Sequence, residues 1–215
     1  MSLIDKVIAA VTPPESDEAR AEARQRARAA AGNGDWLSMI LDQHVQVENA
    51  FAAVKEAQGR EARLAAQKRL ATLLTGHSNA EEAVIYPALA EVSEKMHATS
   101  GYTEQAATKM QLGLLETLDP LSQEFLDKLE HIQGAVQHHV YAEEHNWFID
   151  LKRKLPVNEE ARLTHRFREE FERYMGGEQS LAGVSSGGSG SVARSGASGD
   201  LEAGSVPRSA ESVIR

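Results

Sequence analysis

The chain has 215 residues, a formal net charge of −9 at pH 7, 41% hydrophobic residues and only 5% aromatic residues. The acidic balance argues against general nucleic-acid binding, because a phosphate backbone is bound through a basic face. Because cysteine is absent, this chain can form no disulfide, thiolate metal site, iron–sulfur cluster or cysteine nucleophile.

Residues 1–34 are predicted to form a helical appendage. Their apolar start carries charges, so it makes a poor signal peptide. Glu15–Ala31 follows as an Ala/Arg/Glu helix that has little apolar face and ends at Gly32–Gly34. Within it, Arg20–Arg28 alternate with glutamates and are interpreted as a solvated helix face. No stretch approaches the roughly 18 apolar residues of a membrane span. We therefore expect a cytoplasmic protein with neither a membrane nor a nucleic acid as partner.

Residues 35–176 are predicted to form one helical bundle, with Asp35 as the first N-cap. Strand-like alternation and hairpin signals are absent. The fold class is therefore all-α: an antiparallel up-down four-helix bundle with extra N- and C-terminal helices. The helices are expected at Trp36–Gln58, Arg60–Tyr86 with an end or kink at Pro87, Thr103–Leu118, Ser122–Lys154, and Asn158–Met175.

Residues 177–215 contain mostly Gly, Ser and Ala with scattered charges. Such a composition lacks the apolar groups that would offset the entropy of ordering the chain. The sequence therefore predicts a disordered tail.

A His-x-x-x-Glu spacing occurs four times in the chain. On a helix, residues i and i+4 lie on one face about 6 Å apart, so an imidazole and a carboxylate can reach one metal ion. Spacing alone is weak evidence, because His–Glu pairs also form ordinary surface contacts. The pairs are His44/Glu48, His77/Glu81, His139/Glu143 and His165/Glu169.

The apolar stripes of the predicted helices separate these pairs. At about 100° per residue, the pairs that begin at His77 and His139 lie on core stripes, and His44 lies with Leu37 and Phe51. His165 points away from the stripe of its helix, so its pair is expected in solvent.

Three helices thus direct a histidine, and at least two direct a glutamate, into one interior. Burying unpaired carboxylates would cost several kcal/mol each, and shared cations remove that cost. A buried His–Glu hydrogen-bond network is the alternative. Imidazole and carboxylate ligands without thiolate favour iron or manganese over structural zinc.

The sequence resembles hemerythrin-like HHE cation-binding domains. The resemblance lies in Leu41–His44, in the segment from Gly76 to Pro87 and in the segment from His138 to Glu144, and it extends over about Trp36 to Leu155. It implies a four-helix bundle with two non-haem iron ions, oxo- and carboxylate-bridged. Carried over, His44, His77 and His139 are terminal ligands, while Glu81 and Glu143 are the bridges.

One position departs from the family pattern. The family usually has Glu-His near the start of its third helix, where this chain has Glu104-Gln105. The helical wheel places Glu104 near a stripe of Ala107, Met110, Leu114 and Leu118, and Gln105 facing outward. Glu104 is therefore predicted as the sixth metal-ligand residue. The alternatives are an open position or a ligand from His97 or His131, and His138 is expected beside the site or on the surface.

The resemblance implies a metal-binding protein that binds or reduces a small oxidant, such as dioxygen, hydrogen peroxide or nitric oxide, and so a role in oxygen binding or oxidative stress. Whether it is an enzyme stays open. The alternatives are a non-catalytic iron or oxygen sensor and a metal-free helical interaction module. The sequence leaves the oligomeric state undetermined.

Overall fold

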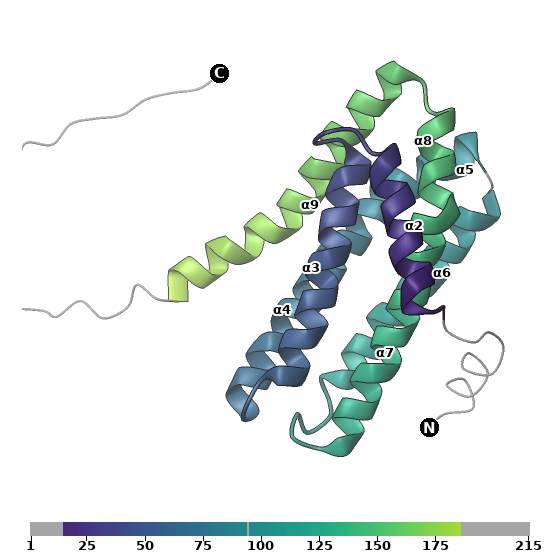
Figure 1. Ribbon diagram of the computed structural model, residues 1–215. Helices are drawn as coiled ribbons and strands as arrows, with labels where there is room; N and C mark the ends of the chain where they lie inside the picture. Colours follow the sequence, from purple (N-terminus) through teal and green to yellow (C-terminus); the bar gives the residue numbers. More distant parts are fainter. Residues whose placement is uncertain (1–14, 94, 186–215) are drawn as a thin grey trace, which may run out of the picture.

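A computed structural model describes residues 15–93 and 95–185, and every regular element in this part of the chain is helical (Figure 1). The all-α prediction is therefore confirmed. The predicted elements within residues 1–14 and 186–215 lie outside the described residues.

Four helices form the bundle: α3 (Trp36–Glu56), α4 (Arg60–Ala80), α6 (Lys95–Leu115) and α7 (Gln123–Ala142). Helices α3 and α4 pack as one pair and α6 and α7 as another, while α3 also contacts α7 and α4 contacts α6. Short connections make neighbouring helices antiparallel, as the up-down arrangement requires.

Three sequence signals set the helix ends. Asp35 caps α3 by accepting a hydrogen bond from the Ser38 amide at 2.8 Å, and Ser122 caps α7 through the Phe125 amide at 3.1 Å. Gly59 joins α3 to α4 with φ of 82°, a conformation in which glycine has no Cβ to clash. The N-cap predicted at Asp35 is confirmed.

Two long helices widen into π-helical turns halfway along. Helix α4 passes through η1 (Glu81–Ile85) into α5 (Tyr86–Val92), and α7 passes through η2 (Glu143–Trp147) into α8 (Phe148–Lys154). Each π turn begins at the glutamate of a His-x-x-x-Glu pair. Such turns are rare and are frequent at functional sites.

In the described part of the chain, two further helices flank the bundle. Helix α2 (Asp17–Ala30) packs on α3, α7, η2 and α8, and α9 (Val157–Ser185) packs on α3, α4 and η1. The predicted end of the last helix at Met175 was wrong, because α9 runs through Gly176 and Gly177 to Ser185. Glycine weakens a helix by about 1 kcal/mol but does not clash with it, so helix-forming neighbours can carry the helix onward.

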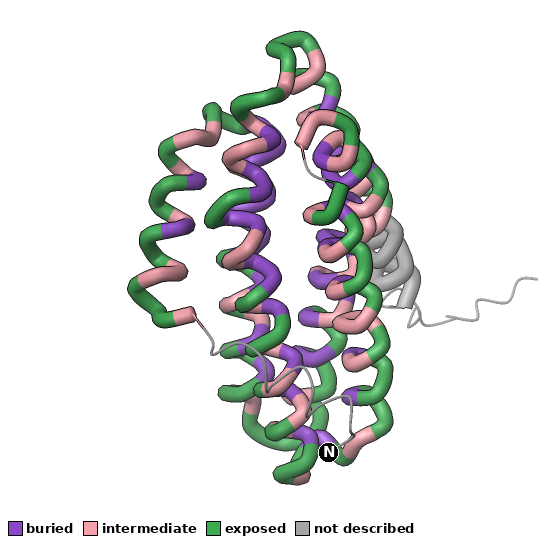
Figure 2. Tube along the Cα trace, turned by 90° about the vertical axis from the view of Figure 1, so that its right-hand side faces the viewer, coloured by how far each residue is buried: buried purple, intermediate pink, exposed green. Residues whose placement is uncertain are grey.

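Buried residues line the inward faces of the helices (Figure 2) and form two separate apolar clusters. One contains Trp36, Ile85 and Phe148, and the other contains Phe51 and Phe125. Along α3, α4 and α7 the polar histidines fall between the stretches that feed the two clusters. The fold therefore places one polar layer between two apolar ones.

Candidate metal centre

Four buried side chains converge in this polar layer. His44, His77, Glu81 and Glu143 each offer a ligand atom, and within the described part of the chain these atoms lie within 4.8 Å of one another. His139 lies beside them, with its Nε2 3.2 Å from Glu143 Oε1. The convergence expected from the apolar stripes is thus present.

The three imidazole rings share one orientation. Each turns Nε2 towards a central carboxylate and binds an outer oxygen through Nδ1. An Nδ1–H that donates outward fixes the ring and leaves the Nε2 lone pair for a metal ion. The outer bonds are His44 Nδ1 to Glu144 at 2.8 Å, His77 Nδ1 to Gln43 at 2.8 Å, and His139 Nδ1 to Glu104 at 2.7 Å.

Buried polar atoms without hydrogen-bond partners gather at the centre. They include His44 Nε2, Glu81 Oε1, Gln105 Oε1 and Glu143 Oε2. Buried polar atoms are nearly always paired, so several together call for an explanation. Bound cations would pair with the histidine and glutamate atoms among them, which are nitrogen and oxygen donors that iron accepts. The residues present therefore fit a metal ion.

Two more side chains complete the layer. The Tyr86 hydroxyl donates to Glu143 Oε1 at 2.9 Å and lies 3.1 Å from His139 Nε2. The Gln105 amide donates to Glu81 Oε2 at 2.6 Å. Both side chains are buried, so each carboxylate has a fixed neutral neighbour.

The electrostatic surroundings shift the pKa values of His44 and His77 in opposite directions. Burial opposes a charge on His44, but its contacts with the carboxylates of Glu143 and Glu144 outweigh burial and raise its pKa to about 9. Burial and the charge of His44 lower the pKa of His77 to about 3. Because imidazole ligates in its neutral form, a cation held by His44 would compete with its proton.

The pKa values of the two central carboxylates, Glu81 and Glu143, are also shifted in opposite directions. Burial, reinforced by the Glu143 charge, raises the pKa of Glu81 well above its ordinary value. Burial acts on Glu143 too, but the charge and hydrogen bond of His139 outweigh it and lower its pKa. Two close carboxylates resist carrying charge together, and cations between them would remove that conflict.

The predicted outward orientation of Gln105 was wrong. The buried stripe of α6 contains Ala98, Gly101, Gln105, Leu112 and Leu115. Met110 and Leu114, from the predicted stripe, are 72% and 52% exposed. Helix α6 presents a glycine and a glutamine to the interior and two large apolar side chains to its surface, so an apolar pattern selects the wrong face.

Glu104 lies at the edge of the layer. Its side chain is 38% exposed, and its carboxylate is hydrogen-bonded to His139 Nδ1. Of the alternatives, His97 stacks on Trp147, and neither His97 nor His131 belongs to the four-residue cluster. The structure thus places Gln105, not Glu104, against a central carboxylate.

The structure confirms the predictions for His165/Glu169 and His138, and it places Glu48 away from the centre. His165 and Glu169 are 68% and 56% exposed, which confirms a solvent pair. His138 is on the surface, where it contacts Glu15. Glu48 is 41% exposed and binds Arg24, so its spacing from His44 does not bring it to the centre.

Sequence reasoning missed Tyr86, Gln43 and Glu144. The adjacent pair Glu143-Glu144 could have indicated Glu144, because Glu144 directly follows a predicted metal ligand. Tyr86 could not be found on an α-helical wheel, because a residue five positions after Glu81 points about 140° away from it. The π turn of η1 brings residues i and i+5 together and so restores Tyr86 to the layer.

A small cavity adjoins the histidines. Its volume is about 20 Å³, which is room for one water-sized molecule. It is lined by His44, Val47, Leu74, His77, Ser78, Gln105, Thr108, Val136, His139 and Val140.

Bundle, polar layer and His/Glu cluster together define a cation-binding helical domain. The hemerythrin HHE cation-binding domain matches residues 35–151, more than half of the chain, and the chain belongs to this family. Helices α2 and α9 lie entirely outside the matched segment.

A "DNA nickase" of Nostoc sp. (strain PCC 7120 / SAG 25.82 / UTEX 2576) is 27% identical over 114 residues, which cover 52% of this chain and 32% of that protein. This chain therefore spans about a third of that relative's length. No solved structure gives a significant match. None of the helices in residues 15–93 and 95–185 combines the length and apolar character that a bilayer crossing requires.

Proposed function

We propose that this chain is a non-haem di-iron protein that binds or reduces a small oxidant. The observation that carries the proposal is the shared orientation of the three imidazoles, each held at Nδ1 and turned by Nε2 towards Glu81 or Glu143. A network built only for stability would have no need of four unpartnered buried atoms at its centre.

In this proposal the side chains of His44, His77, His139, Glu81 and Glu143 would hold the metal ions. Tyr86 and Gln105 orient the two carboxylates by the hydrogen bonds that they donate. Iron bound there would supply Lewis acidity and one-electron redox chemistry.

The cavity supports a small ligand. Its volume of about 20 Å³ suits a ligand of only a few atoms, such as dioxygen, hydrogen peroxide or nitric oxide. Val47, Leu74, Val136 and Val140 form its apolar walls, while Gln105 and the histidines are part of its polar lining. The net charge of −9 also favours a small-molecule ligand over nucleic acid.

Metal analysis tests the proposal directly. Protein produced in iron-replete medium is expected to hold about two iron ions per chain and to show a near-ultraviolet ferric charge-transfer band that reduction removes. Elemental analysis and absorption spectroscopy measure both. Stoichiometric zinc would contradict the proposal, and protein without metal would indicate the interaction module instead. Consumption of peroxide, compared with simple binding, would then separate an enzyme from a sensor.

The Glu104-Gln105 pair gives a second test. Gln105→His is expected to add an imidazole beside Glu81 and tighten Co²⁺ binding, because Gln105 is buried in the layer. Glu104→Ala is expected to weaken binding about tenfold, as the loss of an outer hydrogen bond to a ligand histidine typically does. Chelator competition measures both affinities. A silent Gln105→His together with complete metal loss in Glu104→Ala would instead make Glu104 a ligand.

A further inference from the structure

Glu144 is a buried carboxylate at the outer side of the metal centre. Its side chain is 1% exposed, and it accepts the Nδ1–H bond of His44 at 2.8 Å. A buried carboxylate needs a compensating charge, since its desolvation costs several kcal/mol. That charge comes from outside the bundle.

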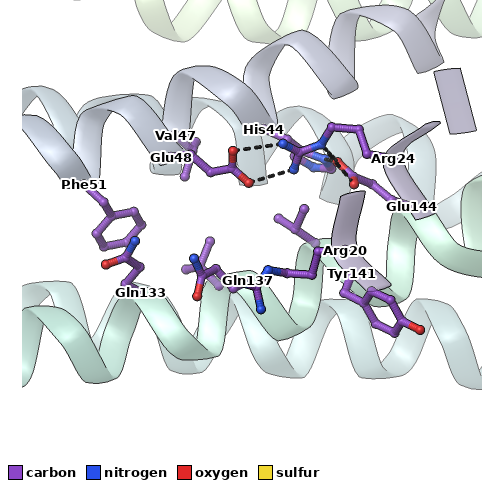
Figure 3. Close-up of a pocket in the computed structure, with 12 residues that line it drawn as sticks. Arg20, Arg24, His44, Val47, Glu48, Phe51, Gln133, Gln137, Tyr141 and Glu144 are labelled. Atoms are coloured by element: carbon purple, nitrogen blue, oxygen red, sulfur yellow. Dashed lines mark hydrogen bonds and ion pairs between the residues drawn. The ribbon is translucent and has the colours of Figure 1, made fainter. Parts of the chain in front are cut away.

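Arg24 of α2 supplies it. Its Nε lies 3.0 and 3.1 Å from the two Glu144 oxygens, and its Nη1 and Nη2 donate to Glu48 at 2.9 and 2.8 Å. Figure 3 shows the guanidinium between the two carboxylates, beside His44. Only the planar, multiply donating arginine can hold two carboxylates in this way.

Helix α2 is shaped to bring Arg24 to this place. It buries just two side chains, Ala23 and Ala27, among its described residues, and these small groups flank Arg24. Small residues let α2 approach the bundle closely at η2 and α7. The expected solvated face at Arg20–Arg28 is therefore wrong for Arg24, whose side chain is 23% exposed.

We infer that Arg24 is a positioning residue of the metal centre: through Glu144 it fixes the ring of His44 with Nε2 inward. The inference rests on the proposed metal binding. It makes α2, which precedes the family-matched segment at residues 35–151, a working part of the site. Arg24 and His44 also line one pocket of about 10 Å³, in which the guanidinium lies beside His44 (Figure 3).

Cobalt binding to the full chain tests this inference. Arg24→Gln is expected to weaken Co²⁺ affinity about 10- to 100-fold, the usual effect of losing support for a ligand histidine, and to shift the Co²⁺ d–d absorption. Arg24→Lys keeps the charge but not both contacts, so its affinity is expected to lie in between. Arg28→Gln is the matched control, because Arg28 lies one turn away and pairs with exposed Asp42.

The double variant shows whether Arg24 acts through Glu144. In a Glu144→Gln background, Arg24→Gln is expected to change Co²⁺ affinity by less than about twofold, because coupled residues are not additive. An equal loss in both backgrounds would overturn the inference. So would an Arg24→Gln variant whose metal-free melting temperature falls while its affinity and spectrum stay unchanged, since that would be a merely structural role.

The same experiment distinguishes failure of the proposed function from failure of the role inferred for Arg24. If the wild-type chain binds no Co²⁺ or iron, the metal centre itself is refuted. If the wild type binds metal and Arg24→Gln binds it equally well with an unchanged spectrum, only the role of Arg24 is refuted.

Discussion

Glu81→Ala and Glu143→Ala are expected to lose most of the bound metal, whereas Glu169→Ala keeps it. Both central glutamates are fully buried and contact buried histidines, at 3.3 Å for Glu81 Oε2 to His77 Nε2 and 3.2 Å for Glu143 Oε1 to His139 Nε2. Removing either one deletes the oxygen donors that two ions would share.

Glu169 is the matched control for that experiment. It belongs to the same His-x-x-x-Glu spacing, but its side chain and that of His165 are largely exposed. Metal content by elemental analysis, at equal protein concentration, distinguishes the three variants. Equal content in all three would contradict the proposed site.

The metal-free variants add a second readout. Glu81 is buried beside a second carboxylate, and both conditions disfavour a negative charge on its side chain. Glu81→Ala is therefore expected to leave the melting temperature of the metal-free protein unchanged or raised. Metal loss without loss of stability would mean that this residue serves the site and not the fold. A strong fall in the metal-free melting temperature would favour the hydrogen-bond network instead.

Gly101→Ala is expected to destabilise the protein by about 1–3 kcal/mol, the range for overpacked cores. An added Cβ would lie 2.6 Å from Cζ of Tyr86 and 3.0 Å from its hydroxyl. The ring cannot move aside cheaply, because it is fully buried and its hydroxyl bonds Glu143. The variant is therefore also expected to disturb the ferric absorption band.

Gly113→Ala on the same helix is the control. A Cβ added at Gly113 would meet no atom of another element within 4 Å, so alanine is expected to stabilise α6 by about 0.5–1 kcal/mol through its helix propensity. Denaturant unfolding of both variants measures the difference. If Gly101→Ala is as stable as Gly113→Ala, the close packing of Tyr86 on α6 is not rigid.

The sequence by itself determined the fold class, the family and the convergent histidines. Helical periodicity fixes which side of α4 and α7 is apolar, and His77, Glu81, His139 and Glu143 lie on that side within one or two turns of strongly apolar residues. Local spacing is enough for such pairs, because an i, i+4 relation does not depend on the rest of the fold.

Only the tertiary structure decided the face of α6, the role of α2 and the place of Tyr86. The inward face of α6 is set by close packing of Gly101 on Tyr86 and by the bond from Gln105 to Glu81, neither of which has an apolar signature. Arg24 meets Glu144 across 120 residues. Tyr86 reaches the site through a π turn that shifts the helical register. Contacts distant in sequence and a changed helical period leave no trace in a regular pattern, so they become visible only when the helices are packed together.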